Sequence, residues 1–205
     1  MIVTAIEEFK KARKKIDIDG EFAFVLYSSE IRKLHLKVDE EISEEEYLMI
    51  TTELLPKRAK LRAMNLLQSK TYTTKQLTEK LREALYPEEI VQEAISYVTS
   101  YHYLDDHRYA REYILYRSEA KSRGRIKQDL MQKGISKEVI EQAYEEALEE
   151  DHLPEEIALI KKELKKKHYD AATATYEEKQ KLAASLFRKG FSTDKIFQAL
   201  DDPDR

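Results

Sequence analysis

The sequence predicts a mainly α-helical protein, with tandem three-helix repeats in an elongated curved array and a small N-terminal β-hairpin and helix module. Charged residues make up 37% of the chain, against four glycines and four prolines, which favours helix over a turn-rich β-protein. One apolar pattern recurs three times from residue 57 onward. Each copy is too small to bury its own apolar face, so neighbouring copies should stack.

A β-hairpin is expected near the N-terminus. Asp19-Gly20 is the strongest kind of two-residue turn signal, and residues 2–8 are a candidate third strand. The flanking apolar residues alternate with others, as in a half-buried strand: Ile16, Ile18, Phe22, Phe24 and Leu26.

Two helices should complete the N-terminal module. Residues 28–36 and 43–55 have helical patterns, and the second begins with a capping box formed by Ser43 and Glu46. Pro56 is expected to close the module.

Three repeats follow. Their aligned segments begin at Thr73, Ser122 and Glu178, each after a further helix (60–69, 106–120 and 154–168). Equivalent apolar positions are Leu77/Leu81, Ile126/Leu130 and Leu182/Leu186, then Ile90, Ile140 and Ile196; Gly134 and Gly190 mark turns. The expected boundaries are 1–55 for the N-terminal module, 56–103, 104–150 and 151–200 for the repeats, and 201–205 for the tail.

The first helix of the middle repeat should bury one stripe: Tyr109, Ala110, Tyr113 and Ile114. Arg117 falls on the same face and is expected to be partly buried and paired with a carboxylate. Asp105 or Asp106 is expected to cap this helix. A metal or acid–base cluster of Asp105, Asp106 and His107 is disfavoured, because adjacent residues on a helix point apart.

The segment KSRGRIKQDLMQKGI, residues 121–135, has an unusual helix start. Ser122 is a good N-cap, but Lys121, Arg123, Arg125 and Lys127 crowd an end that is already positive, and Gly124 weakens the helix. One interpretation is a solvated charged face. The favoured one is an anion site, in which Gly124 lets a phosphate approach and the cations surround it.

Other basic or aromatic segments have two interpretations. Residues 160–169 hold five lysines and residues 56–62 form a shorter basic stretch; each is either a solvated helix face or an auxiliary DNA or partner patch. The tyrosines at 101, 103, 109, 113 and 116 could stack on unpaired bases, but their helical spacing favours core packing for most of them.

Composition narrows the class of protein. The net charge is −4, with acidic runs at 39–46 and 138–151 around a basic segment at 111–133. The chain has no cysteine, no apolar run long enough for a membrane span and no secretory signal, so a cytoplasmic location is expected. It also lacks glycine-rich phosphate loops, nucleophile elbows and HExxH, so we expect no enzyme activity, no metal and no cofactor.

Several segments resemble the RecX family, bacterial regulators of the recombinase RecA. YLDDHRYAREYILYR, RIKQDLMQKGI and VIEQAYEE resemble its middle repeat, LRAMNLLQSKTYTTKQLTEKL its first and LAASLFRKGFSTDKIFQAL its third. The resemblance covers residues 57–200. It implies three helical repeats that bind the groove of RecA–single-stranded DNA filaments and damp strand exchange and coprotease activity. Many members have glycine-proline where this chain has Lys121-Ser122, and the N-terminal module lies outside the shared core.

The positions that match the RecX family are of two chemical kinds: packing residues and candidate contact residues. The expected partner- or DNA-binding residues are Arg108, Arg117, Lys121, Arg123, Arg125, Lys127 and Lys133. A monomer is expected, with weak, salt-sensitive binding to single-stranded DNA alone. The alternatives are a helical DNA-binding module of transcription-factor type and, much less favoured, a metal-dependent nuclease built on Asp105, Asp106 and Glu112.

Overall fold

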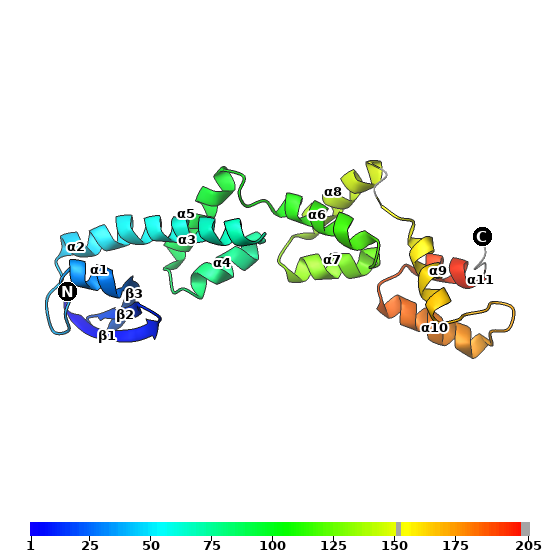
Figure 1. Ribbon diagram of the computed structural model, residues 1–205, viewed down its shortest axis with the longest axis horizontal. Coiled ribbons are helices and arrows are strands. Elements are labelled where there is room, and N and C mark those ends of the chain that lie inside the picture. Colours follow the sequence, from blue (N-terminus) through cyan, green and yellow to red (C-terminus); the bar gives the residue numbers. More distant parts are fainter. Residues whose placement is uncertain (151–152, 202–205) are drawn as a thin grey trace. The chain divides into compact units, whose positions relative to one another are not determined.

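A computed structural model describes residues 1–150 and 153–201 and contains two compact units, the first over Met1–Asp105 and the second from Asp106 (Figure 1). The predicted mainly α-helical class with three-helix repeats is confirmed: helices dominate, and the only sheet among the described residues has three antiparallel strands at the N-terminus. The expected boundaries of the separate modules stay predictions. Residues 151–152 and 202–205 of the predicted third repeat and tail lie outside the described residues.

The sheet forms as the hairpin signal predicts. Strands β1 (Val3–Lys10), β2 (Arg13–Ile18) and β3 (Glu21–Tyr27) pair in the order β1-β2-β3, which confirms the third strand. The turn between β2 and β3 has positive φ at both Asp19 (51°) and Gly20 (87°). Asp-Gly tolerates this left-handed geometry, whose twist matches that of the strands.

The helix that contains Pro56 does not break there, so the expected closure at this proline is wrong. Helix α2 (Glu44–Met49), opened by the predicted capping box, runs through a π-helical turn η1 (Ile50–Leu54) into α3 (Leu55–Ser69). In η1, the Leu55 amide donates to the Ile50 carbonyl. A wider turn accommodates the proline ring, which would otherwise clash with the carbonyl four residues earlier.

The first unit has one hydrophobic core. Helices α1 (Ser28–Lys33), α4 (Thr74–Arg82) and α5 (Glu88–Ser100) complete it, and residues from the sheet and from the first repeat belong to the same buried cluster. Its fully buried members include Phe24, Ile50, Leu77 and Ala94.

Arg58 of α3 holds the sheet against the first repeat. Its guanidinium donates to the Glu30 carboxylate at 2.6 Å and to the Val25 carbonyl at 2.7 Å, and it lies over the rings of Tyr27 and Tyr86. The Arg58 side chain is only 13% exposed. Charge-assisted bonds are strong in such a site, where water competes little.

The second unit has two cores, one for each repeat. Helices α6 (Asp106–Ser118), α7 (Arg123–Gln132) and α8 (Lys137–Glu149) surround the first; α9 (Glu156–Lys166), α10 (Tyr176–Arg188) and α11 (Thr193–Asp201) surround the second. The predicted stripe on α6 is confirmed, because Ala110 and Ile114 are buried and Tyr109 and Tyr113 pack against them. No helix in the described ranges has the length and apolarity that a bilayer span requires.

The second helix of every repeat ends in the same left-handed turn. The residue with positive φ is Leu85 (61°) in the first repeat, Gly134 (89°) in the second and Gly190 (83°) in the third. The next amide in each turn donates to a carbonyl five residues back, as in a Schellman motif. The repeat alignment therefore extends to backbone geometry.

We expect Arg58→Met to lower the free energy of unfolding by about 2–4 kcal/mol, because Glu30 would keep a half-buried charge without its partner. Urea denaturation followed by circular dichroism measures this. Arg62→Met is the matched control, since Arg62 is an exposed arginine on the same helix. Equal effects of the two substitutions would contradict the role given to Arg58.

Candidate functional site

Two of the cations predicted at the start of α7 pair with Asp129. Lys121 Nζ lies 2.5 Å from one carboxylate oxygen and Arg125 Nε lies 3.2 Å from the other. Tyr113 donates to the same group at 3.1 Å. Burial opposes ionisation of Asp129, but hydrogen bonds from Lys121 and Tyr113 and the charge of Arg125 outweigh it, so the pKa of Asp129 lies below its usual value.

The other two cations pair with Glu141 of α8. Lys127 Nζ lies 2.5 Å and Arg123 Nη2 3.0 Å from its carboxylate oxygens. Both cations also lie near the Tyr144 ring, with Arg123 4.6 Å from its centroid. The hydrogen bond from Lys127, followed by the contribution of Arg123, holds the pKa of Glu141 below its usual value.

The four cations therefore have internal carboxylate partners, so the start of α7 is not the open anion site that the favoured interpretation predicted. Each of the two carboxylates is shared by two cations, which leaves a formal excess of two positive charges in these clusters. Local pairs with Asp129 of the same helix and pairs with Glu141 of α8 offset the unfavourable charge at the helix start. The role of these cations in binding stays a prediction.

Gly124 does not open a path for phosphate, because the turn after α10 occupies that space. A Cβ on Gly124 would overlap the carbonyl oxygen of Gly190, and a Cβ on Gly190 would lie 2.7 Å from the Arg125 amide nitrogen. Two glycines from different repeats thus allow backbone to pack on backbone. The interpretation of Gly124 as a phosphate-approach site is wrong.

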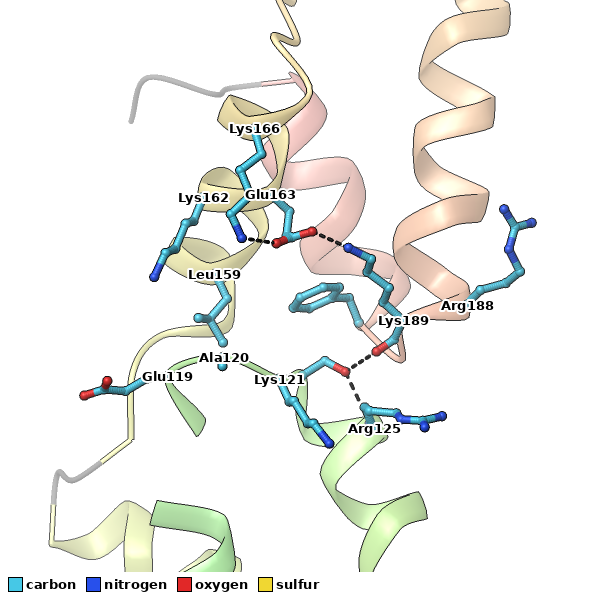
Figure 2. A pocket seen from close by; sticks show the side chains of 12 residues that line it. Glu119, Ala120, Lys121, Arg125, Leu159, Lys162, Glu163, Lys166, Arg188 and Lys189 are labelled. Carbon is cyan, nitrogen blue, oxygen red and sulfur yellow. Dashed lines mark hydrogen bonds and ion pairs between the residues drawn. The ribbon is translucent and has the colours of Figure 1, made fainter. Parts of the chain in front are cut away.

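Ser122 joins the same two segments. As predicted, its hydroxyl oxygen caps α7 by accepting from the Arg125 amide at 3.2 Å. The hydroxyl also donates to the Lys189 carbonyl at the end of α10 (Figure 2). The carbonyl end of one helix therefore meets the amide end of another, a favourable alignment of helix dipoles.

The remaining predicted residues lie on or near α6. Arg117 is half-buried as expected, but it has no carboxylate partner among the described residues, so that part of the prediction is wrong. Its guanidinium lies over Tyr113 and Tyr116, at 5.7 and 4.9 Å from the ring centroids. Lys133 lies near the rings of Tyr109 and Tyr113, and Arg108 is exposed on α6.

A cationic pocket of about 360 Å³ lies where the second and third repeats meet (Figure 2). It contains two predicted cations and four from α9 and the end of α10, against two acids, Glu119 and Glu163. The six cations are Lys121, Arg125, Lys162, Lys166, Arg188 and Lys189. We call these six residues and the space they line the inter-repeat pocket.

Glu163 neutralises part of the inter-repeat pocket. It pairs with Lys166 at 2.8 Å and with Lys189, and these two hydrogen bonds lower the pKa of Glu163 to about 2. Lys162 and Arg188 are exposed and have no ion pair within residues 1–150 and 153–201 (Figure 2). These two cations are therefore available to an external anion.

Sequence reasoning found part of this pocket. Lys162 and Lys166 belong to the basic stretch 160–169, for which a partner patch was one interpretation. Arg188 and Lys189 were missed as site residues. Their signal was a basic pair directly before the turn glycine, Gly190, which places both near the neighbouring repeat.

The acid–histidine segment of α6 shows no metal geometry. Within the described part of the chain, no three His, Asp or Glu side chains are grouped so that they could hold a metal ion. His107 lies 3.2 Å from Glu146. Of the five tyrosines considered for base stacking, Tyr109 and Tyr113 pack against the core, whereas Tyr101, Tyr103 and Tyr116 are exposed, so the expectation of core packing for most of them is wrong.

The fold makes this chain a helical-repeat protein, and the inter-repeat pocket makes a charged surface between repeats its candidate site. Three family descriptions match the chain: the first three-helix domain of RecX at residues 59–97, the second at 105–143 and the third at 154–200. The chain belongs to the RecX family of regulatory proteins.

Two relatives and one solved structure match nearly the whole chain, and a second solved structure matches a smaller part of it. "Regulatory protein RecX" of Caldanaerobacter subterraneus subsp. tengcongensis is 32% identical over 98% of this chain and 99% of the relative; that of Bacillus subtilis is 28% identical over 97% and 76%. A crystal structure of regulatory protein RecX matches 98% of each chain with a TM-score of 0.64 and 27% identity. RecX from Lactobacillus salivarius matches 72% of this chain and 97% of its own, with a TM-score of 0.60 and 26% identity.

We expect Gly124→Ala to destabilise the contact between α7 and the turn after α10 by about 1–3 kcal/mol, because the added methyl overlaps the Gly190 carbonyl. Hydrogen–deuterium exchange of peptides covering residues 186–192 measures this locally. In an isolated helix the same substitution would stabilise by up to about 1 kcal/mol, so slower exchange would contradict the contact.

Glu163 should make stability depend on pH. Because its pKa is lowered from 4.5 to about 2, its contribution is fully present above pH 4.5 and is lost as the pH falls toward 2. Allowing for solvent around the two lysines, we expect Glu163→Gln to lower the free energy of unfolding at pH 7 by roughly 1–2 kcal/mol.

Urea unfolding of the wild-type chain and of Glu163→Gln at pH 7, 4 and 2 measures this effect. The difference between the two should vanish near pH 2. Glu145→Gln is the control, since Glu145 is exposed and has no ion pair in the described ranges. A pH-independent difference would show that Glu163 acts by packing alone.

Proposed function

We propose that this chain is a non-enzymatic regulator of the recombinase RecA, which binds RecA–single-stranded DNA filaments and mostly inhibits recombinase and coprotease activity in DNA repair. Membership of the RecX family supports the regulatory role. The single observation that carries the binding mode is the inter-repeat pocket, in which six cations face two acids.

The inter-repeat pocket fits an anionic surface. Lys121, Arg125, Lys166 and Lys189 are held in place by internal carboxylates, whereas Lys162 and Arg188 are left to bind an external group. The paired cations still contribute, since they outnumber the acids that hold them. A filament that presents acidic side chains and DNA phosphate would neutralise this excess.

Binding to DNA alone should be weak and fall steeply with salt, because few phosphates would be engaged. The protein would act as a monomer in the cytoplasm, with no metal or cofactor. Arg108, Arg117, Arg123, Lys127 and Lys133 are the further candidate contacts on the second repeat. They extend the proposed surface beyond the inter-repeat pocket.

A transcription-factor mode is less well supported. Such a mode would place the N-terminal residues of a recognition helix in the major groove. The turn at Gly190 packs directly on the N-terminal residues of α7, so this end of the helix is not open to a groove in the packing described.

The test is RecA ATPase activity on single-stranded DNA, with and without the full chain. We expect inhibition by the wild-type chain. Lys162→Glu with Arg188→Glu should weaken inhibition at least about tenfold, because two attractive contacts become repulsive. The matched control is Arg32→Glu with Lys33→Glu, which reverses two exposed cations in the first unit.

Unchanged ATPase activity with stoichiometric wild-type chain would reject the proposed regulation. Equal inhibition by the wild-type chain and the pocket variant would retain the regulation but move the contact away from Lys162 and Arg188. Circular dichroism of the variants checks that the helices are intact.

A further inference from the structure

The end of the β1–β2 hairpin carries a dense run of cations outside the three repeats. Five of the six residues from 10 to 15 are basic, with no acid among them. They lie at the end of β1, in the turn and at the start of β2: Lys10, Lys11, Arg13, Lys14 and Lys15. We call these five residues the basic hairpin.

Most of this charge is not neutralised internally. Lys14 pairs with Glu8 at 2.9 Å, and Lys10 Nζ donates to the backbone carbonyl of Glu83 at 3.3 Å. Lys11, Arg13 and Lys15 have no carboxylate within ion-pair distance among the described residues. Like charges concentrated in this way repel one another unless an external anion is bound.

Phe9 gathers three of these cations around its half-buried ring. The charged groups of Lys10, Arg13 and Lys15 lie 4.9, 5.5 and 5.6 Å from the ring centroid. Such contacts favour cations over the ring face and restrict long side chains that would otherwise move freely. The cluster is thus partly ordered before any partner binds, which lowers the entropic cost of binding.

The strand geometry places two of the cations, Arg13 and Lys15, side by side on one strand face, and Lys11 lies in the adjoining turn. Arg13 and Lys15 lie on the face of β2 opposite Ile16, which is fully buried. Residues two apart on a strand are separated by about 6.7 Å. This separation is comparable with that of successive phosphates in an extended nucleic-acid strand.

We propose that the basic hairpin is a nucleic-acid binding site, which holds the phosphate backbone of a single strand through Lys11, Arg13 and Lys15. A flexible single strand can follow a row of cations, and its phosphates present charge at regular intervals. The inference does not rest on RecA regulation or on the inter-repeat pocket, because the hairpin belongs to the first unit.

An anionic membrane fits the hairpin less well. Stable interfacial binding combines cations with exposed apolar side chains that insert among the lipids. Between Lys11 and Arg13 the turn offers only the methyl group of Ala12, and Phe9 is half-buried under the cations. The hairpin therefore has charge for a polyanion but little to insert.

The experiment measures binding of the full chain, without recombinase, to a fluorescent single-stranded oligodeoxynucleotide over a range of salt concentrations. We expect Lys11→Gln with Arg13→Gln and Lys15→Gln to weaken binding at low salt at least about tenfold. The slope of log affinity against log salt should become less steep by about 2, as for three lost phosphate contacts.

The matched control removes the same charge from exposed sites elsewhere in the first unit: Arg32→Gln with Lys33→Gln and Lys75→Gln. We expect this variant to bind within about twofold of the wild-type chain, because isolated surface charges contribute little. Equal losses of affinity in both variants would overturn the proposal, because they would indicate a non-local effect of charge. An unchanged affinity of the hairpin variant would also overturn it.

One further measurement does not depend on how the variants fold, and another tests the membrane alternative. Hydrogen–deuterium exchange of the wild-type chain should show protection of peptides covering residues 9–15 when the oligodeoxynucleotide is added; no protection there would overturn the proposal. Vesicles with about 30% phosphatidylglycerol test the membrane alternative. Binding to vesicles that the hairpin substitutions abolish, with DNA binding unchanged, would also overturn it.

Discussion

The backbone contact between Gly124 and Gly190 determines where the charges of the second and third repeats lie. Because neither residue has a side chain, the turn after α10 reaches the first residues of α7, and Ser122 bonds to both segments. Cations from α7, α9 and the end of α10 then line one pocket. A single methyl group at this point would separate the two halves of the pocket.

In the second repeat, each of two carboxylates is shared by two cations and so neutralises part of their charge. Asp129 and Glu141 each bind two cations, so the segment at the start of α7 is neither fully neutral nor an open anion site. The pocket next to it uses the same arrangement, with Glu163 between Lys166 and Lys189. These cations are held in place and exceed the acids that pair with them. Such a surface suits a partner with several negative groups spread over a broad area, because long-range electrostatic attraction does not require one closely packed contact.

The sequence predicted those features that depend on neighbouring residues. The Asp-Gly hairpin, the capping box at Ser43, the cap at Ser122 and the glycine turns follow from local rules, and all are present.

Several features that the sequence did not predict depend on residues distant in the chain. Gly124 meets a glycine 66 positions away, and Arg123 and Lys127 meet Glu141, whose position depends on how α7 packs on α8. The helix through Pro56 was missed because a π-helical turn leaves no clear sequence pattern. The basic run at residues 10–15 is visible in the sequence, but only the hairpin geometry shows that its cations gather around Phe9.

The left-handed turn has Leu85 in the first repeat, where the other two repeats have glycine. A leucine there bears about 1–2 kcal/mol of backbone strain, and its side chain keeps any neighbouring main chain at a distance. The turn of the first repeat thus cannot receive a helix start as Gly190 receives Gly124. The repeats are consequently not interchangeable: a gene rearrangement that exchanged the first and third copies would preserve each helical triplet and lose the joint between adjacent ones.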